Sequence, residues 1–268
     1  MNLVLQIGDK GVSESELYYL LAQYKLLPQL AKEIIIDQAI ANFECTPEEK
    51  TLGQQQFYQK HRIASEEQVQ AWLKHYGMTP EQLAHLTVRD LKLQKFKQLT
   101  WGSQIESYFL KCKGKLDRVV YSLIRTKDSG IAQELYFRIQ EGENSFSEIA
   151  KEYSQGSEAQ TGGLIGPVEL NVPHPNISQI LSASQPGQLC SPQRVGEWWI
   201  ILRLEQYISA QLDETTRRRL LNELFEQWLS TQMEKVEFMP FNQLVVNNNQ
   251  ETENREKATV NLSHSELS

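Results

Sequence analysis

The segment 119–205 constrains the fold more than any other part of the chain, because a strand pattern begins it and another ends it. Residues 119–124 form a short apolar run rich in β-branched side chains, which predicts a strand. Residues 198–204 predict a second strand with two different faces. Alternation along it places Ile200, Leu202 and Leu204 on one face and Trp199, Ile201 and Arg203 on the other.

Helix and turn signals fill the interval between these two strands. One predicted helix ends near 139–143, and a second, over 146–154, has an apolar face made by Phe146, Ile149, Ala150 and Tyr153. Gly162-Gly163 can adopt positive φ and bring the backbone close to a neighbouring strand. Pro186-Gly187 is typical of a turn. The segment therefore predicts a small α+β module.

This order of elements resembles the parvulin family of peptidyl-prolyl cis/trans isomerases. Four motifs carry the resemblance: residues 146–154, the glycines of 162–166, Pro186-Gly187 with Ser191-Pro192, and residues 196–204. The resemblance covers about a third of the chain. It implies a small antiparallel sheet with flanking helices, and an X-Pro peptide as the ligand.

The resemblance also shows which polar groups of the family this chain lacks. Parvulins usually carry a histidine in the first strand, a cysteine or aspartate after the second helix, and a histidine in the last strand. These positions fall on Ser122, on or near Gly156, and on Trp199. The positions that form the proline cup fall near Pro173 and Ile177. We therefore expect Ser122 and Trp199 to stand at the catalytic positions.

Apolar side chains can still line a substrate groove: Leu164, Val168, Pro173, Ile177 and Trp199. Ser122 offers one hydrogen bond, and His174, between two prolines, is a candidate polar group at the rim. Each residue also has a purely structural interpretation: Trp199 as core, Ser122 as a small residue under a helix, and His174 as a loop residue. Arg125 and Lys127 stand where some parvulins carry basic residues that favour acidic substrates; the alternative is a solvated turn.

The N-terminal 110 residues carry repeated helix-start signals. Ser13 with Glu16 predicts a capping box, as does Ser65 with Gln68. Thr46-Pro47 and Thr79-Pro80 each combine a cap with a proline in the first turn. The starts have no fixed period, which predicts an irregular helical bundle. Their succession is similar to the helical region of chaperone-isomerases of the SurA and trigger-factor kind.

The rest of the chain suggests how the module is inserted. A basic stretch at 111–115 is a candidate linker. A predicted helix after residue 212 carries a broad apolar stripe that needs a partner. The N-terminal bundle is the natural candidate for this partner. After about residue 240 the sequence is too polar to offset the entropy of ordering. The predicted divisions are a helical chaperone-like domain (1–115), the parvulin-like domain (116–207), a C-terminal helix returning to the bundle (208–240) and a disordered tail (241–268).

Composition excludes several classes of function. A net charge of −7 argues against general nucleic-acid binding. The three cysteines show no CxxC spacing, so neither a zinc site nor a disulfide framework is expected, and no cofactor is implied. The pattern is typical of a reducing compartment. Neither a signal peptide nor a membrane span is recognisable in the sequence, so we expect a cytoplasmic location.

These observations favour a peptidyl-prolyl isomerase that acts on unfolded or extended clients and also binds them as a chaperone. The alternative is a catalytically degenerate module that binds or escorts a secreted or processed peptide. A scaffold without a peptide groove is a third possibility. The expected partner is a proline-containing peptide or an unfolded protein, with a secretion system as a further candidate.

Overall fold

A computed structural model describes residues 3–239. Its contacts divide the chain into two compact units. One comprises residues up to Gly102 together with the chain from Asn222 onward, and the other comprises Ser103–Leu221. Each unit is described by itself below.

The second unit contains a four-stranded antiparallel sheet with the strand order β4-β3-β6-β5. Its strands are β3 (Arg118–Thr126), β4 (Leu164–Glu169), β5 (Leu189–Val195) and β6 (Trp198–Ile208). Its helices are α6 (Ile105–Leu116), α7 (Ser129–Gln140), α8 (Phe146–Tyr153), the 3-10 helix η2 (Ser157–Thr161) and α9 (Pro175–Ala183). The first and last predicted strands, β3 and β6, are the two central strands.

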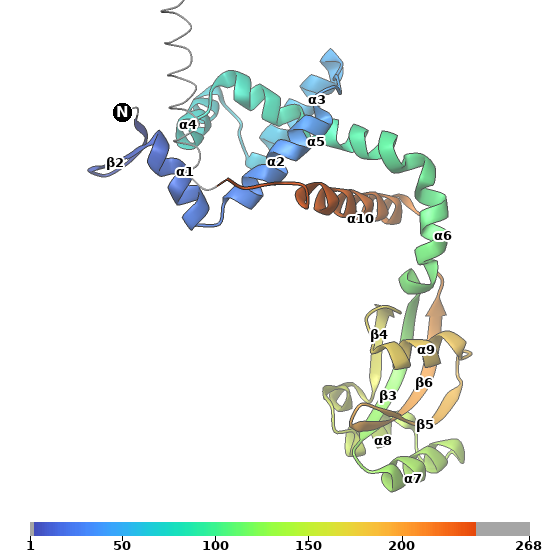
Figure 1. The fold of residues 1–268 in the computed structure, drawn as a ribbon. Helices are drawn as coiled ribbons and strands as arrows, with labels where there is room; N and C mark the ends of the chain where they lie inside the picture. Colours follow the sequence, from blue (N-terminus) through green and yellow to red (C-terminus); the bar gives the residue numbers. More distant parts are fainter. Residues whose placement is uncertain (1–2, 240–268) are drawn as a thin grey trace, which may run out of the picture. The chain divides into compact units, whose positions relative to one another are not determined.

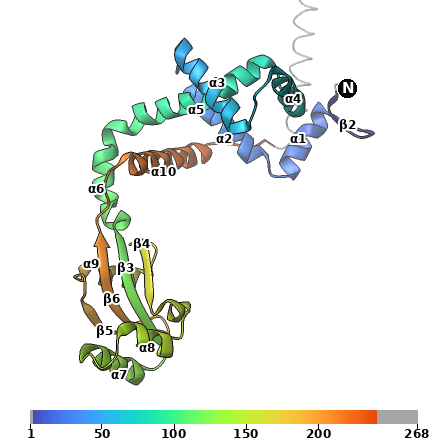
Figure 2. The same cartoon turned by 180° about the vertical axis from the view of Figure 1, so that it is seen from behind.

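Helices cover both faces of this sheet. Helix α9 covers one face (Figures 1 and 2). Its Ile177 and Leu181 pack with Leu123, Ile200 and Leu202. On the other face Phe146, Ile149 and Ala150 of α8 pack with Ile124 and Ile201. The alternation predicted for 198–204 is therefore confirmed: Ile200, Leu202 and Leu204 lie in the first cluster and Ile201 in the second. We call these two surfaces the α9 face and the α8 face.

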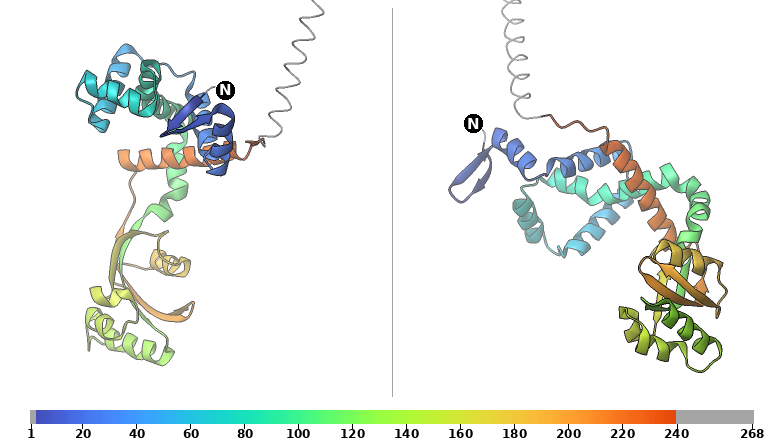
Figure 3. Two further views of the ribbon diagram at one scale, coloured as in Figure 1. Left: turned by 90° about the vertical axis from the view of Figure 1, so that its left-hand side faces the viewer. Right: turned by 60° about the horizontal axis from the view of Figure 1, so that its bottom comes forward.

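The first unit is mainly helical, with a β-hairpin at its start (Figure 3). It contains β1 (Leu3–Ile7), β2 (Lys10–Ser13), α1 (Glu14–Gln23), α2 (Leu27–Ile40), α3 (Pro47–His61), α4 (Glu66–Tyr76) and α5 (Pro80–Trp101), and the 3-10 helix η1 (Gly102–Gln104) follows. The predicted caps at Ser13, Thr46 and Thr79 are confirmed as capping boxes. Ser65 caps α4, but Gln68 accepts a hydrogen bond from the backbone of Ala64 instead of closing the box.

The hairpin corrects the expectation that the N-terminal region is helical throughout. Leu3, Leu5 and Ile7 alternate with other residues, and Gly8, with φ of 59°, makes the turn to β2. This period of two is a strand signal. Pro28 lies in the first turn of α2, where its fixed φ suits the helix.

The C-terminal helix α10 (Glu214–Met233) begins as predicted, with Asp213 accepting a hydrogen bond from the amide of Thr216 at 2.7 Å. Within the first unit its aromatic side chains meet those of α5. The ring centroids of Phe96 and Trp228 are 5.2 Å apart, and those of Phe225 and Trp228 are 5.7 Å apart. Lys97 adds a hydrogen bond to Asn222 at 2.9 Å. This part of the predicted stripe thus packs on the N-terminal helices.

Two boundary predictions differ from the structure or lie outside it. The basic stretch 111–115, a candidate linker, forms the last turns of α6, where Lys113 and Lys115 suit the negative end of the helix dipole. The units divide after Gly102 and after Leu221. The tail proposed for 241–268 lies outside the described residues.

Candidate functional site

A cleft of about 340 Å³ opens on the α9 face of the sheet. Its walls come from strand β3, the start of α9, the β5–β6 turn and strand β6. The residues that line it are Leu123, Arg125, His174, Ile177, Val195, Gly196, Glu197, Trp198 and Ile200. Most of these side chains are apolar, and the two charged ones, Arg125 and Glu197, come from β3 and from the β5–β6 turn. The cleft can therefore take an apolar group and offer hydrogen bonds around it.

Helix α9 supplies one wall through a proline-led start. Pro175 occupies the first turn, and His174 is the N-cap, whose Nδ1 accepts a hydrogen bond from the amide of Asn176 at 3.3 Å. The carbonyl of Pro173 accepts a hydrogen bond from Ser178 at 3.3 Å. These contacts fix His174 and Ile177 at the cleft, whereas Pro173 does not line it. Two of the predicted binding residues are thus brought together.

Trp198, the first residue of β6, also lines the cleft. It is half-buried and packs against the cluster on the α9 face. The ammonium of Lys127 lies 5.2 Å from the centre of its ring. Lys127 also pairs with Glu197 at 3.5 Å, with both side chains largely exposed. Trp198 is therefore held at the cleft by its packing, with a solvated ion pair above it.

The two positions expected to be catalytic lie on the α8 face instead. Ser122 is buried and donates a hydrogen bond to Glu205 at 2.5 Å, and Glu205 also accepts one from Arg203 at 2.8 Å. Trp199 pairs across the sheet with Thr126 and points away from Trp198 by the alternation of the strand. Neither residue lines the cleft. The contacts of Ser122 fit its structural interpretation, a small polar residue packed under a helix.

The other two predicted groove residues lie on β4. Leu164 pairs with Ser122 across the sheet, so it shares the α8 face, and it is 50% exposed. Val168 pairs with Val119 and packs against the cluster on the α9 face. The cleft is lined by neither of them. The predicted set is thus divided between two faces of one sheet.

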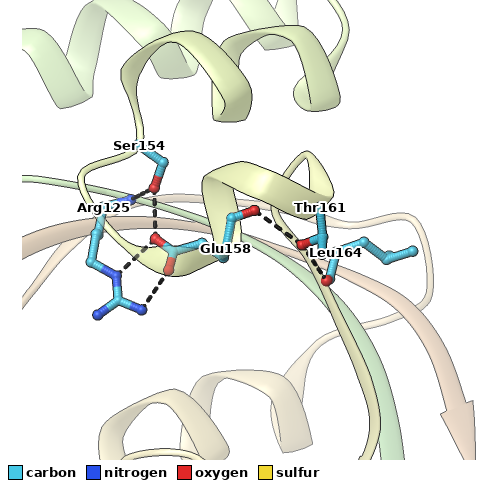
Figure 4. A network of polar contacts seen from close by, with 5 residues as sticks. All are labelled: Arg125, Ser154, Glu158, Thr161 and Leu164. Carbon is cyan, nitrogen blue, oxygen red and sulfur yellow. Dashed lines mark hydrogen bonds and ion pairs between the residues drawn. The ribbon is translucent and has the colours of Figure 1, made fainter.

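Arg125 is the best-fixed polar group of the cleft (Figure 4). Its Nε donates to Glu158 at 2.8 Å and its Nη2 to the second oxygen of the same carboxylate at 2.7 Å. Ser154 also donates to Glu158, at 2.6 Å, and accepts from the backbone amide of Arg125 at 3.0 Å. The Glu158 side chain is 2% exposed and that of Arg125 is 32% exposed. A buried carboxylate therefore orients a partly exposed guanidinium.

The same pair explains why glycine stands at position 156. A Cβ on Gly156 would overlap the Glu158 carboxylate and lie 2.5 Å from Nε of Arg125. The resemblance places the cysteine or aspartate of the family on or near this residue. In this chain the Arg125–Glu158 pair fills the space that such a side chain would need.

The ionisation of Glu158 follows from this environment. Burial raises the pKa of the carboxyl group, but hydrogen bonds from Arg125 and Ser154 outweigh it, so that the pKa lies below its ordinary value. Glu158 is therefore charged at neutral pH and neutralises Arg125. Within the described residues, no three His, Cys, Asp or Glu side chains gather closely enough to hold a metal ion.

Sequence reasoning missed Leu123 and Trp198 as lining residues. Each stands next to a predicted residue, Ser122 or Trp199, and neighbouring positions in a strand point to opposite faces. A signal was available in β6, because Ile200, predicted to share a face with Leu202, also shares it with Trp198. Arg125 was recognised as a candidate, but its buried partner Glu158 was not.

Comparison with known proteins agrees with this architecture. Residues 125–206 match the family model described as Rotamase: PPIC-type PPIASE domain. The chain is similar to the chaperone SurA of Pseudomonas fluorescens (strain Pf0-1), with 31% identity over 113 residues, 38% of this chain and 26% of that protein. It is also similar to the chaperone SurA of Shewanella sp. (strain MR-7), with 26% identity over 117 residues, 40% of this chain and 27% of that protein. The matches span about a quarter of these curated relatives.

A solved structure extends the likeness to the fold of most of the chain. The peptidylprolyl isomerase PrsA from Bacillus cereus aligns over 89% of this chain and 94% of its own, with a TM-score of 0.50 and 18% identity. No helix among residues 3–239 combines the length and apolar character needed to cross a bilayer. The matched family model, the antiparallel sheet and its covering helices lead to one conclusion: the chain carries a domain of the parvulin-type, or PPIC-type, peptidyl-prolyl cis/trans isomerase family.

Proposed function

We propose that this protein binds extended segments that contain X-Pro bonds and accelerates their cis/trans isomerisation in the cleft on the α9 face. The carrying observation is the cleft itself, in which Leu123, Ile177 and Trp198 make an apolar seat beside the donors of Arg125. A proline ring needs such a seat, and the carbonyl next to it needs a donor. Both requirements meet at one place.

Rotation about an X-Pro bond requires neither a nucleophile nor a metal. The barrier arises from amide resonance and is about 18–20 kcal/mol for a peptide bond. Resonance separates charge between oxygen and nitrogen, so an apolar seat that removes water from the amide favours the less polar, twisted form. A cleft that grips both sides of the bond can also hold the twisted geometry. Leu123, Ile200 and Trp198 supply these effects without the histidines of the family.

The helical unit supports the second half of the proposal, chaperone-like binding. Leu30 and Ile34 lie four residues apart on one side of α2, and Leu26, the N-cap of this helix, stands four residues before Leu30. The three residues are 45%, 47% and 42% exposed, respectively. Exposed apolar stripes of this kind mark interaction sites. We assign this stripe to unfolded segments of a client, in keeping with the similarity to SurA chaperones.

A catalytically degenerate binder is the second candidate, and one observation favours it. The lining of the cleft contains no thiol, and its one carboxylate, that of Glu197, pairs with Lys127. His174 lines the cleft as the N-cap of α9. Such a cleft can hold a proline segment without accelerating its rotation. A secretion-system partner finds no support in the described residues, and the cytoplasmic location stays a prediction.

Exchange spectroscopy on the full chain separates the two candidates. Two-dimensional NMR of an Ala-Pro peptide gives the cis-to-trans exchange rate with and without protein, and line broadening gives the dissociation constant. We expect binding and faster exchange, both weakened in Trp198→Ala and retained in the matched variant Trp199→Ala. Binding without faster exchange would establish the degenerate binder. An absence of binding would reject both candidates and leave the scaffold.

For the chaperone role, the measurement is light scattering of a chemically unfolded client that aggregates on dilution. We expect the full chain to suppress the aggregation and Leu30→Gln with Ile34→Gln to weaken the suppression. The control is Lys32→Gln, on another side of α2. Equal suppression by all variants would remove the stripe from the proposal.

A further inference from the structure

The polar network at the mouth of the cleft supports an inference about how the substrate is held, and this inference rests on the function proposed above. We infer that Arg125 is the substrate-binding donor of this site, and that Nη1 donates a hydrogen bond to a backbone carbonyl of the X-Pro segment. Arg125, which is held by Glu158, thus supplies the polar group that the family's cysteine or aspartate would supply at position 156.

Geometry leaves one edge of the guanidinium for a ligand. Nε and Nη2 are both engaged by the Glu158 carboxylate in a two-pronged contact. Nη1 has no hydrogen-bond partner among the described residues, and Figure 4 shows it pointing away from Glu158. Because Arg125 lines the cleft, this nitrogen carries donors at the edge of the apolar seat.

The network also makes Arg125 rigid, which a binding residue requires. Glu158 is fixed by Ser154, whose hydroxyl also accepts from the amide of Arg125. The carbonyl of Arg125 in turn accepts from the amide of Gln155 at 3.0 Å. A planar guanidinium held at two points loses little further entropy when its third nitrogen meets a carbonyl.

The charges around the cleft specify the kind of ligand. Glu158 balances Arg125, and Glu197 balances Lys127. His174 is the remaining titratable side chain in the lining. The mouth of the cleft therefore carries no excess positive charge from these pairs, and Arg125 acts as an oriented dipole. We expect it to prefer a neutral backbone carbonyl and to give no advantage to an acidic or phosphorylated residue before proline.

The test uses the full chain and three peptides that differ only in the residue before proline: alanine, glutamate or phosphoserine. Exchange spectroscopy gives the catalysed rate and line broadening gives the dissociation constant. In the wild type we expect the alanine and glutamate peptides to agree within about threefold. Arg125→Lys keeps the charge but loses the fixed fork, and we expect it to weaken binding or turnover of the alanine peptide roughly tenfold or more.

Glu158→Gln gives a signature that a purely structural role would not produce. This substitution removes the balancing charge but keeps the shape of the side chain. The affinity for the glutamate peptide, divided by the affinity for the alanine peptide, should therefore rise several-fold. Lys151→Met is the control, because Lys151 is exposed on α8 and does not line the cleft, and this variant should leave the binding and turnover of the alanine peptide unchanged. Thermal melting of each variant excludes unfolding. If Arg125→Lys were destabilised, the double variant Arg125→Gln with Glu158→Gln, which keeps a neutral hydrogen-bonded pair, should show the same loss.

The outcomes separate this inference from the proposed function. If the wild type binds the peptides and Arg125→Lys binds and isomerises them equally well, the role of Arg125 is overturned and the proposed function stands. A strong wild-type preference for glutamate or phosphoserine would overturn the neutral-carbonyl assignment. A wild type that neither binds nor isomerises any of the three peptides would overturn the proposed function, and this inference with it.

Discussion

Trp198 and Trp199 are adjacent in the chain but lie on opposite faces of the sheet, and Trp198 alone of the two lines the cleft. Trp198→Ala should therefore weaken proline-peptide binding about tenfold or more, as truncation of a central aromatic anchor does. Trp199→Ala should leave peptide binding unchanged. Titration monitored by NMR, with a melting curve for each variant, checks this pair. Weaker binding in Trp199→Ala but not in Trp198→Ala would reverse the assignment of the faces.

The aromatic cluster between α5 and α10 should stabilise the helical unit. Phe225 is 3% exposed, with its ring 5.7 Å from that of Trp228 and the ammonium of Lys97 4.2 Å from its centre. Phe225→Ala should cost about 3–5 kcal/mol of unfolding free energy. Hydrogen exchange should show the loss in α5 and leave β3 and β6 protected. Arg218→Ala, an exposed change on the same helix, is the control, and equal protection in both variants would remove the cluster from the account of stability.

The depressed pKa of Glu158 predicts an acid-sensitive contribution to stability. Because the folded-state pKa lies below the unfolded value, this contribution is present above roughly pH 4.3 and is lost as pH falls through the folded-state pKa. Chemical denaturation between pH 2 and 7 should show a shallower loss of stability below pH 4.3 in Glu158→Gln than in the wild type. At neutral pH the variant should be less stable by about 1–3 kcal/mol. Parallel curves would show that Glu158 titrates alike in both states.

Isomerisation should depend little on pH between about 5 and 8. Ordinary histidine titrates in that range, whereas Arg125 and the apolar lining do not. His174 is the histidine of the cleft lining, and its Nδ1 accepts a hydrogen bond from the amide of Asn176. Rates measured by exchange spectroscopy across this range should match in the wild type and in His174→Ala. A step near pH 6.5 that disappears in His174→Ala would show that the histidine takes part.

Much of the fold could be predicted from local chemistry. Capping residues such as Ser13 and Thr46 act within one helical turn, so their effect can be read from the sequence. The order of β3, α8 and β6 followed from apolar periodicity and from glycine and proline turns. The hairpin of β1 and β2 was missed, although Leu3, Leu5 and Ile7 alternate, because one short exposed strand resembles a loop until its partner is known.

The site was harder to predict because a shift of one residue reverses the face of a strand. Ser122 and Trp199 were placed one position from Leu123 and Trp198, and β3 and β6 have an irregular register between Val120 and Tyr121. The Arg125–Glu158 pair joins residues that are 33 positions apart. Such a pair depends on how η2 returns to the end of β3, which no local pattern specifies.

The most direct test of the account is to map where a proline peptide binds. The measurement is the change in backbone amide shifts of the full, isotope-labelled chain as an Ala-Pro peptide is added. We expect the largest changes at the residues of the α9-face cleft, among them Leu123, Arg125 and Trp198. Changes centred on Ser122 and Glu205, on the α8 face, would contradict the placement of the site. If no amide shift changes up to the solubility limit of the peptide, the result would contradict a peptide-binding function for the parvulin-type domain.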